Sequence, residues 1–218
     1  MALVLFNNLT EKDKSLAIEK LISNSTPSQD FFLMMILSVL MASFGILVNS
    51  MAVVIGSMLI APLLSPVLSL SLGVILSDSK LIRRSGKTIL LSSMWSIVAA
   101  ATTSVFFGAG GGVSPQMLAA IEPSFLYIAI AIIAGFAATF SLVKPKLNEA
   151  LPGVAISIAL IPPLAMMGIG IAKLEWAIIT NSLLLFTLNI IGIVFASMIT
   201  FSLMNFYVKR SVAKRKLY

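Results

Sequence analysis

Two apolar segments that contain proline carry the residues that could bind a solute. The first reads IGSMLIAPL (residues 55–63) and the second ISIALIPPL (residues 156–164), and they match at an interval of 101 residues. Proline has no amide hydrogen, so it leaves a carbonyl of the preceding turn without its helical partner. In a membrane such a carbonyl is tolerated only where protein or a water-filled cavity satisfies it. Paired breaks of this kind are typical of transporter sites for small solutes or ions.

The candidate contacts lie around these breaks. Small residues recur at every fourth position through the predicted second span, from Ser57 to Ser77, which indicates either close helix packing or a polar lining along a pathway. Proline kinks that serve only structure are the alternative for the breaks themselves. Asn189 needs a partner in hydrocarbon, so it either ties helices together or contacts a solute. The candidate substrate- or ion-binding residues are Ser57, Ala61, Pro62, Ser65, Pro66, Ser157, Ile161, Pro162, Pro163 and Asn189.

Composition excludes most covalent chemistry. The chain has no histidine and no cysteine, which excludes disulfides, thiol catalysis, and zinc or haem sites built on these ligands. We expect no metal, no cofactor and no enzymatic activity, and a serine–lysine pair at an interface is the one catalytic arrangement left open. The acids near the apolar runs all fall at the ends of those runs: Asp78, Glu122, Glu149 and Glu175. A proton relay through a buried carboxylate is therefore not expected.

Hydropathy places these segments in a membrane protein. Of the 218 residues, 59% are hydrophobic and 11% are charged, and the mean hydropathy is +1.06. A soluble chain of this length has too small a core to bury so many apolar side chains. Crossing a bilayer takes about 20 apolar residues. The sequence predicts six spans, at residues 31–48, 51–77, 88–108, 124–143, 151–172 and 176–206.

Basic residues separate to one side of the predicted membrane. With both termini in the cytoplasm, all of the 15 lysines and arginines except Lys173 fall on the cytoplasmic side. The net charge of +7 therefore reflects topology, and no nucleic-acid partner is expected. The expected location is the cell membrane, with the N-terminus and C-terminus cytoplasmic. Anionic lipid headgroups are the expected partners of the basic clusters, which include Lys80, Arg83, Arg84, Lys87, Lys209 and Arg210.

The six spans divide into two related halves. An odd number of spans in each half makes the second half enter the membrane from the opposite side. The predicted fold class is an all-α integral membrane protein, with two inverted three-helix repeats whose second and fifth helices are broken at proline. The expected segments are an N-terminal extension at 1–30, repeats at 31–109 and 124–206, and a basic tail at 207–218. The extension predicts a helix that lies either on the membrane surface or against the bundle as a cytoplasmic cap.

The two proline segments in their wider context resemble a known family. VVIGSMLIAPLLSPVLSLSLGVILSD (Val53–Asp78) and LPGVAISIALIPPLAMMGIGIA (Leu151–Ala172) look like the hallmark segments of domain-of-unknown-function family 389. LLLFTLNIIGIVFA (Leu183–Ala196) also fits its last segment. The resemblance implies an uncharacterised membrane domain of archaea and bacteria, and it implies no substrate.

The proline breaks, the six predicted spans and the one-sided distribution of basic residues together predict a membrane transporter or channel for a small solute or ion. Its site lies at mid-membrane between the two broken helices, and it is not evidently proton-coupled. The alternative is a non-transporting membrane scaffold or assembly subunit with a dry core. Because small residues also allow protomers to pack closely, a homo-oligomer is expected.

Overall fold

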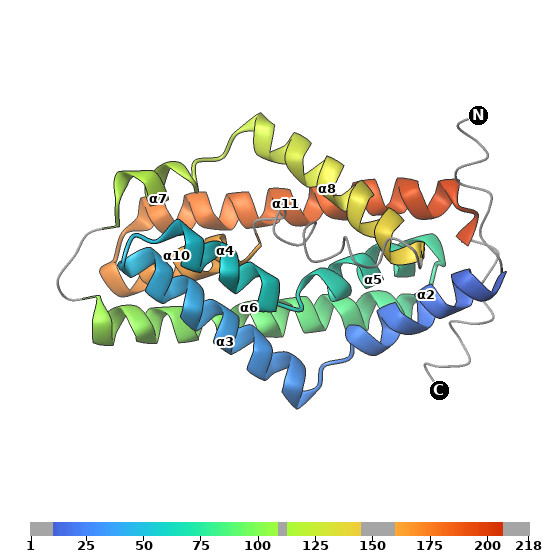
Figure 1. The fold of residues 1–218 in the computed structure, drawn as a ribbon, viewed down its shortest axis with the longest axis horizontal. Coiled ribbons are helices and arrows are strands. Elements are labelled where there is room, and N and C mark those ends of the chain that lie inside the picture. The colour runs from blue at the N-terminus through green and yellow to red at the C-terminus, as the bar shows by residue number, and fades with distance from the viewer. Residues whose placement is uncertain (1–10, 109–112, 145–159, 207–218) are drawn as a thin grey trace.

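The protein is an elongated helical bundle (Figure 1). The computed structural model describes residues 11–108, 113–144 and 160–206, and every element assigned in these ranges is a helix. The helices are α2 (Glu11–Asn24), α3 (Gln29–Leu47), α4 (Met51–Ile60), α5 (Leu64–Ile75), α6 (Ser79–Phe107), α7 (Pro115–Ala119), α8 (Phe125–Val143), α10 (Ile161–Lys173) and α11 (Trp176–Leu203). The all-helical prediction is confirmed.

Within the described residues, four helices are long and apolar enough to cross a membrane: α3, α6, α8 and α11. The pair α4 and α5 makes a fifth candidate span, bent by 51° at its break. Helix α10 is apolar but has 13 residues, and residues 151–159 of the predicted fifth span lie outside the described ranges. The described residues therefore contain four or five candidate spans, and the sixth stays a prediction.

The break between α4 and α5 falls around Pro62. Ala61 has φ −70° and ψ 123°, which is the extended conformation that a residue before proline favours. Pro62 cannot donate to the helical ladder, so α4 ends at Ile60. Helix α5 begins at Leu64 with Pro66 in its first turn, where an amide hydrogen has no helical partner in any case.

Three helix pairs are joined by the same tight corner. In each corner the amide of one residue donates to a glycine carbonyl five positions earlier. The residue directly before the donor has a positive φ of 50–58°. This is the Schellman motif, which satisfies the last carbonyls of a helix. The amide–glycine pairs are Ser50–Gly45 at 2.8 Å, Asp78–Gly73 at 2.9 Å and Glu175–Gly170 at 2.9 Å, and the left-handed residues are Asn49, Ser77 and Leu174. The chain therefore turns directly from one helix into the next.

The helices of the second half follow those of the first at a nearly constant interval. Helices α3 and α8 begin at 29 and 125, an interval of 96 residues; α5 and α10 begin at 64 and 161, and α6 and α11 at 79 and 176, intervals of 97. All seven buried residues of α5 have buried counterparts 97 positions later in α10. The same holds for nine of the ten buried residues of α6, whose counterparts lie in α11. Both halves therefore bury the same helix faces.

This interval differs from the 101-residue match found in the sequence. At 97 residues, Pro163 corresponds to Pro66 instead of Pro62. The two intervals differ by about one helical turn, so both alignments put the prolines on the same helix face. The pattern of apolar residues alone does not distinguish the 97-residue alignment from the 101-residue one. The first residues of the helices and the buried helix faces do.

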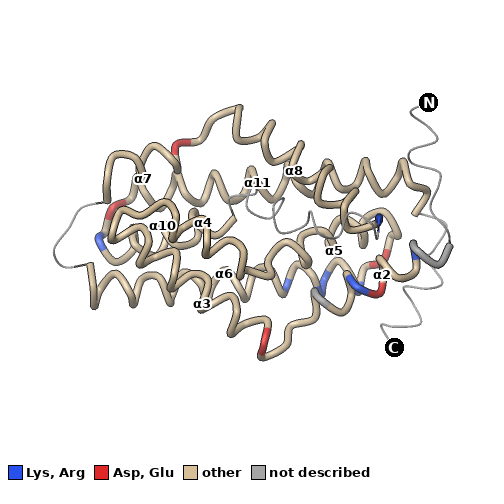
Figure 2. Tube along the Cα trace, in the orientation of Figure 1, with Lys and Arg blue, Asp and Glu red and all other residues tan. Residues whose placement is uncertain are grey.

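Charged residues gather at the ends of the bundle (Figure 2). Most of the described lysines and arginines lie at the end where α6 begins and α8 ends, which we call the basic end. Lys173 and Glu175 lie at the corner between α10 and α11, at the opposite end. Between these ends the helices are mostly apolar, apart from the acidic start of α3 (Figure 2), as expected for a structure that crosses a membrane.

Helix α2 is packed against the bundle at the basic end. It contacts α5 and α8 and buries Ala17, Ile18, Leu21 and Ile22. The turn that follows it is fixed by hydrogen bonds. The Ser25 hydroxyl donates to the Ser69 hydroxyl (3.1 Å), the Thr88 hydroxyl donates to the Ser25 carbonyl (3.3 Å), and the Arg84 guanidinium donates to the Thr26 hydroxyl. Of the two expectations for this segment, its described part fits a packed cap.

Candidate solute site between the two halves

The short helices α5 and α10 define the candidate site. Both begin near the middle of the bundle and run in opposite directions, α5 toward the basic end and α10 away from it (Figure 1). Each packs on both α6 and α11. The two short helices therefore lie between two long ones, one from each half, and their N-termini lie at mid-length.

Neither short helix is capped by a side chain. Leu63 and Leu160 occupy the N-cap positions, where no side-chain hydrogen bond is made. Ser28, Asp78 and Ser124 cap α3, α6 and α8 with their side chains, whereas α4 and α11 also begin without a side-chain cap. A helix N-terminus carries about half a positive charge from its aligned peptide dipoles. Uncapped starts at mid-length can therefore interact with a polar group of a bound molecule.

The two halves approach closely at Gly168 of α10. A methyl group built there would lie 2.4 Å from the Ala100 Cβ and 2.6 Å from the Ile97 carbonyl oxygen of α6. Only glycine permits this approach, because any side chain would meet backbone atoms of α6. The crossing places the first turns of α10 beside the middle of α6.

A pocket of about 360 Å³ lies at this junction, walled by α5, α6, α10 and α11. Its lining is apolar apart from Ser93. Eight lining residues form four pairs 97 positions apart: Leu70 with Met167, Gly86 with Leu183, Ile89 with Phe186, and Ser93 with Ile190. The pocket therefore lies where equivalent positions of the two halves meet, and we call it the junction pocket.

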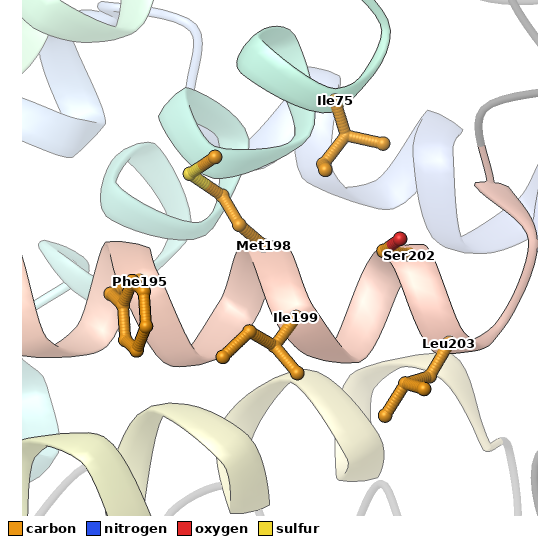
Figure 3. Close-up of a pocket in the computed structure, with 6 residues that line it drawn as sticks. All are labelled: Ile75, Phe195, Met198, Ile199, Ser202 and Leu203. Atoms are coloured by element: carbon orange, nitrogen blue, oxygen red, sulfur yellow. The ribbon is translucent and has the colours of Figure 1, made fainter.

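A second pocket, of about 310 Å³, lies nearer the basic end (Figure 3). Ile75 of α5 reaches it from one side, and α11 supplies the other residues: Phe195, Met198, Ile199, Ser202 and Leu203. Five of these six side chains are apolar. Because nearly all of the lining comes from one helix of one half, this pocket does not share the paired arrangement of the junction pocket.

Five buried serine hydroxyls have no hydrogen-bond partner among the described residues: Ser85, Ser93, Ser96, Ser104 and Ser182. Four of them lie on α6, and Ser182 of α11 is the counterpart of Ser85 at 97 residues. Buried polar groups in folded proteins are nearly always paired. Each of these hydroxyls is enclosed by the packed helices, so an unmet hydrogen bond is stored in the core of the described bundle.

The α6 serines were missed by sequence reasoning. Serine in a membrane helix commonly bonds to its own helix, as the Ser92 hydroxyl does by donating to the Ile89 carbonyl (3.0 Å). Their clustering in one predicted span, at positions 92, 93, 96 and 104, was the available signal. Sequence alone does not show which of these hydroxyls lack a partner.

The predicted contacts in the first half divide into two groups. Ser57 is fully buried; its hydroxyl donates to the Val54 carbonyl (2.6 Å), and its own carbonyl accepts from the Ser38 hydroxyl (2.7 Å). These bonds make Ser57 part of the packing between α3 and α4. Ala61, Pro62 and Ser65 are half-buried, and Pro66 is buried, at the start of α5.

The predicted contacts in the second half lie at the start of α10 and on α11. Ile161 and Pro163 are buried and Pro162 is half-buried, all in the first turn of α10. Asn189 is buried on α11, 97 residues after Ser92. Ser157 lies outside the described residues.

The predicted headgroup contacts are placed in part. Lys80, Arg83, Arg84 and Lys87 lie in the first turns of α6 at the basic end, where Arg84 also holds the turn after α2. Lys209 and Arg210 lie outside the described residues.

Fold and site together define an all-helical, multi-pass membrane protein. The family described as "Domain of unknown function (DUF389)" matches residues 58–195, and the chain belongs to this family. The resemblance seen in the proline segments is thus confirmed.

One similar protein is an uncharacterized protein of Methanocaldococcus jannaschii, 36% identical over 177 residues. The match covers 80% of this chain and 54% of that protein, so the chain spans about half the length of the curated relative it matches. No solved structure matches the chain.

Proposed function

We propose that this protein is a transporter or channel for a small solute or ion, with its site at mid-membrane between α5 and α10. The observation that carries the proposal is that two half-helices without side-chain caps, α5 and α10, pack on the same two long helices, one from each half of the chain. Substrate sites built from broken helices at a repeat interface are a recurring feature of secondary transporters.

The arrangement of the halves supports an inverted repeat. Helices α3 and α6 run toward the end where α11 begins, whereas α8 and α11 run toward the basic end (Figure 1). Corresponding helices are thus antiparallel, as a pseudo-twofold axis in the membrane plane requires. In this proposal α10 is the second part of a broken fifth span that corresponds to α4 and α5, which gives six spans in total.

The chemistry of the site favours binding without a proton relay. Among the described residues outside α2, the acids are Asp30, Asp78, Glu122 and Glu175, and none of them is buried inside the bundle. A carboxylate relay would need an acid at mid-membrane. Helix N-termini and backbone groups near Pro62 are the groups left to bind a solute.

The charge distribution supports an orientation with the basic end in the cytoplasm. Lys80, Arg83 and Lys87 would then face anionic headgroups, each contributing about 1 kcal/mol near the surface. The proposed orientation puts both termini in the cytoplasm and Lys173 outside.

Cysteine accessibility tests the proposed site. The chain has no native cysteine, so Ser65→Cys would carry the one thiol in the intact protein in membrane vesicles. We expect a charged, water-soluble thiol reagent to modify it, because a solute site must be hydrated. The matched control is Val98→Cys on the exposed face of α6, where hydrocarbon excludes the reagent.

A dry core would give the opposite result. No modification at Ser65→Cys, Pro62→Cys or Ile161→Cys, under conditions that modify a cysteine at Lys87, would refute the hydrated site. The non-transporting scaffold would then be the better assignment.

A further inference from the structure

We infer that α2 and α7 are equivalent gates, one at each end of the bundle, and that α7 opens more readily than α2. The inference rests on the proposed function, because it concerns access to the site between α5 and α10. It follows from three features of the two helices: their matching positions in the two halves, the contact that each makes with the other half, and the unequal burial that holds them in place.

The two helices occupy equivalent positions in the chain. Helix α2 directly precedes α3 and α7 directly precedes α8, and the serines that cap α3 and α8 lie at 28 and 124, an interval of 96 residues. The same interval relates Leu21 to Met117 and Ser25 to Ile121, and all four of these residues are buried. Figure 1 shows α2 at the basic end and α7 toward the end where α11 begins, which we call the far end. Both halves are therefore preceded by a helix that covers one end of the bundle.

Each of these helices contacts the half that it does not precede. Helix α2 leads into the first half and contacts α8 of the second half. Helix α7 leads into the second half, and the Ser114 hydroxyl at its N-cap donates to the side-chain oxygen of Asn49 (2.7 Å), in the corner that follows α3. Because α3 and α8 are counterparts, the two contacts are reciprocal. Each end of the bundle is thus fastened across the boundary between the halves.

The halves can part at one end only if the helix at that end loses its contacts. Helix α2 also packs on α5, and the turn after it bonds to Ser69 of α5 and Thr88 of α6. If α8 moved away from α5, α2 could stay with only one of them, and its apolar side chains would be exposed to water at a cost that grows with their area. Separation at the far end would break the bond between Ser114 and Asn49. Access to the proposed site is therefore coupled to the release of one helix at either end.

The two contacts differ in strength. Helix α2 has 14 residues and buries four apolar side chains, and the turn after it takes part in three hydrogen bonds with α5 and α6. Helix α7 has five residues and buries Met117, and its bond to Asn49 is exposed. Apolar burial stabilises in proportion to area, whereas an exposed hydrogen bond competes with water and contributes little. The far end therefore opens first.

Distances between nitroxide labels on the full chain in lipid nanodiscs test this inference. The chain has no native cysteine, so exposed positions can be labelled in pairs. The basic-end pair joins Lys87 of α6 to Ser202 of α11, and the far-end pair joins their counterparts at 97 residues, Leu184 of α11 and Val105 of α6. Pulsed electron resonance on these two otherwise unchanged chains should find the larger long-distance population at the far-end pair.

Truncating one buried side chain in each helix should open one end at a time. Leu21→Ala loosens α2 and should add a population about 5 Å longer at the basic-end pair, leaving the far-end pair unchanged. Met117→Ala loosens α7 and should do the reverse. The matched controls are Leu16→Ala and Gln116→Ala, at exposed positions of the same two helices, and should change neither distance. Thr26→Val removes a hydrogen-bond acceptor from the turn after α2 and is the milder second variant at the basic end.

Three results would overturn the inference. The first is an unchanged basic-end distance in Leu21→Ala although faster amide hydrogen exchange shows that α2 is released. The second is unchanged exchange of α2 in both Leu21→Ala and Thr26→Val, because the named contacts would then not hold the helix. The third is a response of both label pairs to either variant, which would indicate general loosening of the bundle. A larger long-distance population at the basic-end pair of the otherwise unchanged chain would overturn the order of opening.

The two proposals fail separately. A reactive Ser65→Cys with label distances that do not respond would keep the transport site and remove the gates. Responsive distances with an unreactive Ser65→Cys would keep two ends that open independently and remove the hydrated transport site.

Discussion

Replacing Gly168 with alanine should destabilise the protein, whereas the same replacement at Gly86 should stabilise it. At Gly168 the new Cβ would lie 2.4 Å from the Ala100 Cβ, 2.6 Å from the Ile97 carbonyl oxygen and 2.7 Å from the Ala101 amide nitrogen. Two of these three are backbone atoms that cannot rotate away. Helix α10 would have to retreat from α6 by about 1 Å to restore ordinary contact.

The magnitude follows from two opposing terms. Overpacking of this kind costs about 1–3 kcal/mol, and alanine gains about 1 kcal/mol over glycine in a helix interior. Because the clash is with backbone, we take the upper end of the cost and expect a net loss of about 2 kcal/mol at Gly168. At Gly86 no atom of the described chain opposes the methyl group, so a gain of about 0.5–1 kcal/mol remains.

Reversible unfolding by sodium dodecyl sulfate in one fixed detergent, followed by circular dichroism, gives both free energies on the same scale. The two glycines are mutual controls, because each variant adds the same methyl group to the same kind of helix. Shifts of the same sign would refute the reasoning. An unchanged Gly168→Ala variant would mean that α6 and α10 do not cross at this point.

Two further predictions concern the ends of the bundle. Leu174→Gly should raise stability by about 1 kcal/mol in a thermal scan, because φ is 58° and the side chain is 84% exposed; a lower melting temperature would contradict this. Leu21→Ala should weaken the docking of α2 by about 2–4 kcal/mol, since that side chain is 1% exposed. Amide hydrogen exchange should then rise in α2 and stay unchanged in α11, while Leu16→Ala, at a position that is 51% exposed, should have little effect.

Hydropathy and proline chemistry were sufficient to predict the class of the fold. Long apolar runs predicted the helices that could span a membrane, and Pro62 predicted the end of α4, because both depend on local sequence. The family assignment followed from the same proline segments. These features require no knowledge of which helices pack together.

Features that depend on packing were not predictable from the sequence. The interval of 97 residues emerged from helix starts and buried faces, since an apolar match one turn away is equally good. Ser57 is the residue type expected of a solute contact and lies beside the proline break. Its hydroxyl nevertheless donates to the Val54 carbonyl of its own helix. The α2 segment would carry the same pattern whether it lay on lipid or on protein, and its contacts with α5 and α8 distinguish the two.

The tight corners at Ser77 and Leu174 have a mechanical consequence. Each corner joins a short helix to the following long helix without flexible linker residues. Helices α5 and α6 would therefore tilt together as one stiff hairpin, and so would α10 and α11. In the first half, bending of the backbone is then confined to residues 61–63, where the helical hydrogen bonds are interrupted. Spin labels placed within one hairpin should keep their spacing during any working cycle, while labels on opposite hairpins should separate and approach.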